Sequence, residues 1–177
     1  LSFFITRRAA EGVYKFKEVW AERKVNKDWN RILQAHFFQG LREGTFIFVV
    51  SVMVFITTGS ELALGTYGLV NSAVAFVGYY VASRFIKQKN RLRFIFTGGL
   101  LLYGAVFLLI FNLSYPKLII YAVCIAIAYP ILLVPFISLS YDVIGRAKDV
   151  VSKRNEYIVV REVFLNIGRV DSISLFL

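Results

Sequence analysis

The sequence has few of the residues from which metal and disulfide sites are built. It contains one cysteine, Cys124, and one histidine, His36, among 177 residues. A disulfide needs two cysteines and a structural metal site usually needs four ligands, so we expect neither. The sequence also lacks a recognisable nucleophile–base set, a phosphate-binding glycine loop and an HExxH motif. It therefore predicts no metal, no cofactor and no enzymatic activity.

Charged residues are missing from four long stretches of the chain. The residues without Asp, Glu, Lys, Arg or His number 17 after Glu43, 22 after Glu61, 23 after Arg93 and 24 after Lys117. A helix of about 20 apolar residues crosses the hydrocarbon core of a bilayer. Hydrophobic residues make up 58% of the chain, which is above the range of ordinary soluble domains. The sequence predicts an all-α, polytopic transmembrane helical bundle surrounded by the lipid bilayer.

The positive charges are concentrated in alternate connectors between these stretches. A net charge of +10 could indicate nucleic-acid binding, but Lys and Arg avoid the apolar runs. They number eight in residues 1–31, none in 58–61, five in 84–93, one in 112–117 and four in 142–156. This alternation is the pattern of the positive-inside rule. We therefore expect residues 1–31 to be cytoplasmic and nucleic acid not to be a partner.

Hydrophobic periodicity and breaker residues give the limits of the expected helices. The predicted spans cover residues 31–57, 62–83, 94–111 and 118–141, followed by a helix over 155–177 that the sequence end cuts short. Pro130 and Pro135 predict a bend near residues 129–135. Ser152 or Asn155 is the expected cap of the last helix. That helix is too polar to face lipid throughout, and it is either a truncated cavity-lining span or an amphipathic surface helix.

Two adjacent charges, Arg42 and Glu43, fall at the cytoplasmic end of the first span. An ionisable side chain inside a membrane helix costs about 2.5 kcal/mol or more to insert, so it is usually paired or functional. Alternatively, Arg42 extends to the lipid headgroups and Glu43 interacts electrostatically with a basic loop. Adjacent helical residues diverge by about 100°, so these two should not pair with each other. Gly40 and Gly44 have the spacing that allows close helix approach.

The last helix carries a second polar cluster, formed by Arg161, Glu162, Asn166 and Arg169. The last three are spaced four and three residues apart and should share one face. Such a stripe is typical of a water-filled path or an inter-helix salt bridge, although it could equally anchor the helix to the cytoplasmic loop.

Three polar residues inside the apolar spans, Ser51, Tyr67 and Asn71, could line a cavity. A single polar residue in a membrane helix more often makes a packing hydrogen bond, so both interpretations stay open. His36 has no carboxylate at helical spacing before Glu43, and we expect it at the surface or an interface.

The chain resembles the C-terminal half of a major facilitator superfamily transporter. His36-Phe-Phe-Gln-Gly-Leu-Arg-Glu-Gly44 looks like the start of a seventh helix, and Thr58 to Gly65 looks like the following outer turn. Gly78, Arg84 and Arg91 resemble a degenerate loop motif between helices eight and nine, without the acidic residue and second glycine of that motif. Arg161 to Arg169 looks like the opening of an eleventh helix.

This resemblance implies an organisation and a function. Residues 1–30 would be the cytoplasmic central linker, and residues 31–177 would be the C-terminal transmembrane half of the fold. Helices seven, eight, ten and eleven would face a central cavity, while helix nine would be peripheral. The family binds its substrate near the midplane and works by alternating access. The N-terminal six-helix half and the twelfth helix would be missing, so we expect this sequence to be a fragment.

We therefore expect a secondary active transporter, either a permease or an exporter, in a bacterial inner (plasma) membrane. It would move a small solute, and this movement could be coupled to protons. The candidate substrate or proton-coupling residues are Arg42, Glu43, Asn71, Arg161, Glu162, Asn166 and Arg169. The alternatives are a non-transporting membrane scaffold or subunit, and an intramembrane enzyme whose catalytic motif lies beyond these ends.

Overall fold

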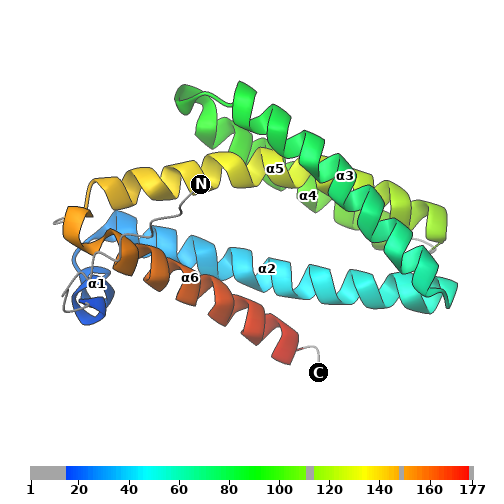
Figure 1. Ribbon diagram of the computed structural model, residues 1–177, viewed down its shortest axis with the longest axis horizontal. Helices are drawn as coiled ribbons and strands as arrows, with labels where there is room; N and C mark the ends of the chain where they lie inside the picture. Colours follow the sequence, from blue (N-terminus) through cyan, green and yellow to red (C-terminus); the bar gives the residue numbers. More distant parts are fainter. Residues whose placement is uncertain (1–14, 111–113, 148–149, 176–177) are drawn as a thin grey trace, which may run out of the picture.

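Helices form all the regular structure in residues 15–110, 114–147 and 150–175, which the computed structural model describes (Figure 1). They are α1 (Phe16–Glu22), α2 (Lys27–Thr58), α3 (Glu61–Phe85), the 3₁₀ turn η1 (Gln88–Asn90), α4 (Arg91–Ile110), α5 (Tyr115–Gly145) and α6 (Val150–Ser174). The prediction of an all-α fold is confirmed. The ends of the predicted spans at residues 111 and 176–177 lie outside the described residues.

Local capping explains where α2 and α3 begin and end. α2 starts at Lys27, four residues before the prediction, because the Asn26 side chain accepts hydrogen bonds from the N–H groups of Asp28 and Trp29, both at 3.1 Å. The helix ends at Thr58 and is capped by Gly59, whose φ of 61° is readily adopted only by glycine. The hydroxyl of Ser60 then caps α3 by accepting from the N–H of Ala63.

The start of the last helix was predicted incorrectly. Ser152 and Asn155 both lie inside α6, which is helical from Val150, so neither caps it. The adjacent α5 continues through Pro130 and Pro135, which are both buried. The bend expected between residues 129 and 135 stays a prediction.

Glycines allow the helices to approach one another closely at several points. α6 packs along α2, while α5 packs against α3 and α4 (Figure 1). A Cβ on Gly40 would come 2.0 Å from the carbonyl oxygen of Leu165, and one on Gly168 would come 2.2 Å from that of Phe37. As predicted from their spacing, Gly40 and Gly44 lie at a close helix contact, and Gly168 of α6 lies on the other side of it.

A cluster of buried aromatic and aliphatic side chains joins α1, α2, α5 and α6 at one end of the molecule. Val19, Trp29 and Tyr157 are its centre, and each is at most 1% exposed. The rings of Trp29 and Tyr157 pack edge-to-face at 5.0 Å. The segment predicted as a linker, residues 1–30, therefore contains helix α1 and the first turn of α2. Its residues 1–14 lie outside the described part of the chain.

Apolar side chains dominate the outward faces of α3 and α4. On α3 these include Leu62 at 81% and Phe76 at 76% exposed, and on α4 they include Phe96 at 68%. In the described part of the chain, four helical segments could cross a membrane by length and composition: α2, α3, η1 with α4, and α5. α6 is not among these four.

Candidate functional site

A cavity of about 770 Å³ lies among α2, α3, α5 and α6. Most of its wall is apolar, and its polar groups come from all four helices. The residues that line it are Gln39, Arg42, Glu43, Phe46, Val50, Ser51, Leu64, Tyr67, Gly68, Asn71, Tyr79, Tyr121, Ile125, Tyr129, Leu133, Ile137, Leu165 and Arg169. α4 contributes no residue to it. This volume is within the range of pockets that bind small organic molecules.

Glu43 is the most densely hydrogen-bonded side chain of the cavity. One carboxylate oxygen accepts from Arg169 of α6, at 2.6 Å from Nη2 and 3.0 Å from Nε. The other accepts from Gln39 Nε2 at 2.8 Å and from the hydroxyl of Tyr129. The Glu43 side chain is only 8% exposed, whereas that of Arg169 is 40% exposed. Glu43 thus joins three helices through charge-assisted hydrogen bonds.

Arg42 does not share this ion pair. Its guanidinium carbon lies 4.5 Å from the centre of the Tyr129 ring and 5.9 Å from that of Phe46, in cation–π geometry. The same tyrosine therefore gives its hydroxyl to Glu43 and its ring to Arg42. As expected from the 100° turn between neighbours, Arg42 and Glu43 do not pair with each other.

Two buried polar atoms at the cavity have no hydrogen-bond partner among the described residues. They are the hydroxyl of Tyr121, a residue with 0% exposure, and the Oε1 atom of Gln39. Buried polar atoms in folded proteins are nearly always satisfied, so each such atom has room for a partner such as water, an ion or a ligand. Together with the charges and aromatic rings, they offer groups for reversible binding of a solute.

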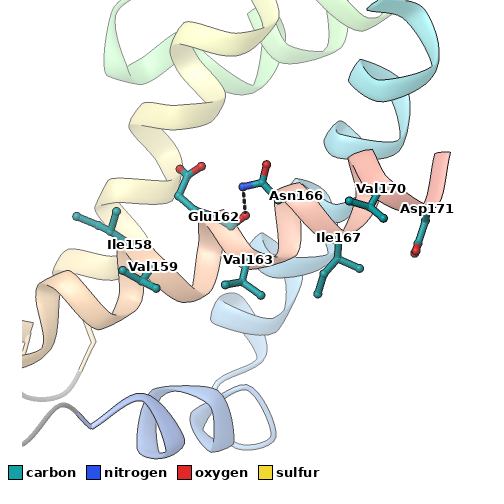
Figure 2. Close-up of a pocket in the computed structure, with 8 residues that line it drawn as sticks. All are labelled: Ile158, Val159, Glu162, Val163, Asn166, Ile167, Val170 and Asp171. Carbon is teal, nitrogen blue, oxygen red and sulfur yellow. Dashed lines mark hydrogen bonds between the residues drawn. The ribbon is translucent and has the colours of Figure 1, made fainter. Parts of the chain in front are cut away.

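The structure separates the predicted polar residues of α6. Arg169 reaches the cavity, but Glu162 and Asn166 line a hollow of about 540 Å³ on the outer face of the helix (Figure 2). Asn166 connects the two sides, because its amide donates to the carbonyl of Glu162 at 2.9 Å and its Oδ1 accepts from Arg169 at 3.1 Å. Glu162, Asn166 and Arg169 thus form the predicted stripe, and only its last member lines the cavity.

Arg161 points to yet another neighbour. It is 7% exposed, and its guanidinium stacks 5.1 Å from the ring centre of Tyr141 on α5 while donating to Glu162. Its Nε and Nη1 atoms have no hydrogen-bond partner among the described residues. Arg161 therefore links α5 to α6 and does not line the cavity that holds Glu43.

His36 is not at the surface, which was one of its two predicted positions, but lies between α2 and α5. His36 is 2% exposed, with Nδ1 2.9 Å from the carbonyl oxygen of Ile32 and its ring 4.6 Å from that of Phe136. A carboxylate is not needed to bury a histidine when the backbone one turn back supplies an acceptor.

The residues of the degenerate loop motif are distributed over two helices. Gly78 lies inside α3 against α5, where a Cβ would come 2.9 Å from the carbonyl oxygen of Ala126. Arg84 is exposed in the last turn of α3. Arg91 begins α4 and forms an ion pair with Asp142 near the end of α5.

Sequence reasoning missed Gln39, Tyr79, Tyr121 and Tyr129. Gln39 precedes Glu43 by four residues, which places both on one helical face. Tyr121 and Tyr129 are members of a stripe that recurs every fourth residue of α5 and also includes Ile125, Leu133 and Ile137. That periodicity was a usable signal, but it does not distinguish a cavity wall from a packed interface.

Comparison with known proteins gives a single informative similarity. No family model and no solved structure matches the chain. It is 59% identical over 177 residues to a Bacillus subtilis (strain 168) protein described as "Uncharacterized protein YqgE". The match includes all of this chain and 41% of the relative, so the chain spans about two fifths of the length of that relative.

Proposed function

We propose that this chain is the C-terminal transmembrane part of a secondary transporter of the major facilitator type in a bacterial plasma membrane. The lipid bilayer would cover the apolar outward faces of α3 and α4. In water, these faces would need to be covered by another protein surface. The residues N-terminal to it would include the other six-helix half of the transporter. A small solute would be carried by alternating access between the halves.

The arrangement of the connectors supports a membrane orientation. In Figure 1, the α2–α3 connection, the end of α4 and the start of α5 lie at one end of the molecule, while η1, the end of α5 and the start of α6 lie toward the other. Thr58 to Glu61 contains no Lys or Arg, whereas residues 84–93 contain five. The basic connectors would therefore lie together on the cytoplasmic side, along with residues 1–31.

The cavity is the observation that carries the transporter proposal. Its walls come from α2, α3, α5 and α6, and α4 stays outside it. In the transporter family that the sequence resembles, α2, α3, α5 and α6 would correspond to helices seven, eight, ten and eleven, and α4 to helix nine. The family is expected to line its cavity with the first four and to keep helix nine at the periphery. The hydrogen-bonded Glu43–Arg169 pair at the wall of this cavity would bind the substrate or act as a gate.

Glu43 is the stronger of the two candidates for proton coupling. It lies in the cavity beside Tyr129 and Arg169, whereas Glu162 faces outward from α6. A carboxylate that pairs with Arg169 in one state and takes up a proton in another would couple the proton gradient to solute movement. Arg42 and Asn71 of the same cavity would then contact the solute.

Transport by the full-length protein in liposomes tests the proposal. We expect concentrative uptake of at least one member of a panel of organic anions, sugars, peptides and cations when a proton gradient is imposed. The variant Glu43→Gln should lower the initial rate by about tenfold or more, because the loss of a charge-assisted hydrogen bond has that magnitude. Glu162→Gln is the matched control and should change the rate little.

Two results would contradict the proposal. Rates equal to those of protein-free liposomes for the whole panel would favour a non-transporting scaffold. An unaltered rate and pH dependence for Glu43→Gln would remove Glu43 from the coupling mechanism.

A further inference from the structure

The charges of the cavity do not balance. Three ionised side chains line it, Arg42, Glu43 and Arg169, and the only carboxylate among them is already bonded to Arg169, Gln39 and Tyr129. Arg42 has no carboxylate partner among the described residues, and its contacts are the faces of Tyr129 and Phe46. Among the described residues, the cavity therefore carries one positive charge in excess, at the half-buried guanidinium of Arg42.

An unpaired guanidinium in a mostly apolar cavity attracts an anion. The apolar walls lower the local dielectric constant, and this strengthens the attraction between the guanidinium and an anion. The planar fork of an arginine matches the two oxygens of a carboxylate, and stacking on an aromatic ring leaves its N–H edges available for that contact. Arg42 thus has the geometry of an anion ligand.

The second observation is the unpartnered hydroxyl of Tyr121. This residue is fully buried and lines the same cavity as Arg42. Its hydroxyl can donate a hydrogen bond to an anion, and the unpaired Oε1 of Gln39 can accept one from a hydroxyl or amine of the same molecule. A buried donor without a partner, beside an unpaired cation, points to an acceptor that a ligand provides.

The rest of the wall determines the body of that ligand. Tyr67, Tyr79 and Tyr129 present aromatic rings, and aliphatic side chains such as Leu64 and Ile125 fill the space between them. Aromatic and aliphatic walls favour a flat apolar group over a sugar, which would need many more hydrogen-bonding partners.

We propose that the cavity binds organic carboxylates with an aromatic body, with Arg42 as the ligand of the carboxylate and the Tyr121 hydroxyl as a second donor. This inference names the solute class of the proposed transporter and rests on that proposed function. The Glu43–Arg169 pair keeps the second arginine occupied, so that the anion is directed to Arg42.

Binding of three matched probes to the full-length protein tests this directly. They are 4-(trifluoromethyl)benzoate, the uncharged 4-(trifluoromethyl)benzamide and the cationic 4-(trifluoromethyl)benzylammonium, observed by fluorine NMR with the protein in nanodiscs of zwitterionic phosphatidylcholine. We expect the benzoate to bind at least about tenfold more tightly than either of the others, which is the usual effect of one charge-assisted hydrogen bond. Arg42→Gln should remove that preference, and Arg42→Lys should restore part of it. Arg84→Gln, outside the cavity, should leave it unchanged.

Tyr121→Phe separates a ligand contact from a structural one. Because the hydroxyl bonds to no described residue, its removal should leave the thermal stability of the ligand-free protein unchanged or slightly raised. Affinity for the benzoate should nevertheless fall by about threefold to tenfold. Loss of stability without loss of affinity would overturn the role assigned to Tyr121.

The outcomes distinguish this inference from the proposed function. Equal binding of the three probes, no binding of the benzoate, or a benzoate affinity that survives Arg42→Gln would overturn the inference, while uptake of any other solute would still support a transporter. Arg42-dependent benzoate binding without any uptake would support the site and contradict the transporter. If the benzoate binds in phosphatidylcholine but loses its affinity when anionic phosphatidylglycerol is added to the nanodiscs, the site recognises a lipid headgroup. This result would overturn the assignment to a soluble carboxylate.

Discussion

Gly168 of α6 lies directly against the backbone of Phe37 on α2. A Cβ at Gly168 would come 2.2 Å from the carbonyl oxygen of Phe37 and 2.9 Å from the amide nitrogen of Leu41. No side chain can fit there unless the two helices separate, because both obstructing atoms belong to the backbone. The next residue, Arg169, donates a hydrogen bond to Glu43 of α2 at 2.6 Å.

Gly168→Ala should therefore destabilise the protein, with a loss of about 1–3 kcal/mol typical of overpacking. Thermal unfolding in detergent measures this. Gly104→Ala on α4 is the matched control, since nothing lies within 4 Å of a Cβ there. It should be neutral or slightly stabilising, because alanine is the better helix former. Equal effects of the two changes would contradict the close helix contact.

The Glu43–Arg169 pair should show strong thermodynamic coupling. Glu43→Gln and Arg169→Gln should each destabilise the protein, and the double variant should lose less than the sum by about 1–3 kcal/mol. Exposed Arg31 and Asp28, whose charged atoms lie 3.3 Å apart with side chains 76% and 70% exposed, provide the control. Their coupling should be about 0.5 kcal/mol or less. Additive effects at Glu43 and Arg169 would show that the pair does not join α2 to α6.

Docking of α1 should depend on pH. Glu18 of α1 forms an ion pair with Lys153 of α6 at 2.8 Å, and the hydrogen bond from Lys153 lowers the pKa of the Glu18 carboxyl. A carboxyl with a lowered pKa stabilises the folded state above its unfolded pKa, about 4.3 for glutamate, and this contribution disappears as the pH falls through the lowered value. Acidification below about pH 4 should thus loosen α1.

Tryptophan fluorescence can follow this loosening. The two tryptophans of this sequence, Trp20 and Trp29, both lie where α1 meets α2 and α6. We expect a red shift of emission on acidification in the parent protein. In Glu18→Gln the emission should already be shifted at neutral pH and should change less with acid. An unchanged acid transition in this variant would assign the effect to other carboxyls, such as Glu22, which accepts from Tyr157.

The sequence predicted the helices better than it predicted their partners. Charge-free runs and breakers located α3, α4 and α5 within a few residues, because the length of an apolar run and the position of a cap are local properties. α2 began earlier than predicted since the Asn26 cap was overlooked. For α6 the error came from treating Ser152 and Asn155 as caps when the helix had already begun.

The site was only partly predictable. Helical phase correctly separated Arg42 from Glu43, and the residues Arg42, Glu43, Asn71 and Arg169 do line one cavity. Phase cannot reveal which residue 126 positions away will pair with Glu43, because that depends on how α2 and α6 pack. Tyr121 was missed for a related reason, since a tyrosine in an apolar run looks the same whether its hydroxyl faces a wall or a cavity.

The side of the membrane on which each connector lies tests the central claim most directly. In a Cys124→Ser background, which removes the single cysteine of this sequence, Glu61→Cys and Lys89→Cys introduce exposed thiols into two successive connectors. Glu61 is preferable to Gly59, whose φ of 61° disfavours a side chain. A membrane-impermeant maleimide added to intact cells should label the thiol at position 61 and spare the one at position 89, and inverted vesicles should give the reverse. Labelling of both from the same side, or recovery of the protein in the soluble fraction without detergent, would contradict a membrane-spanning bundle.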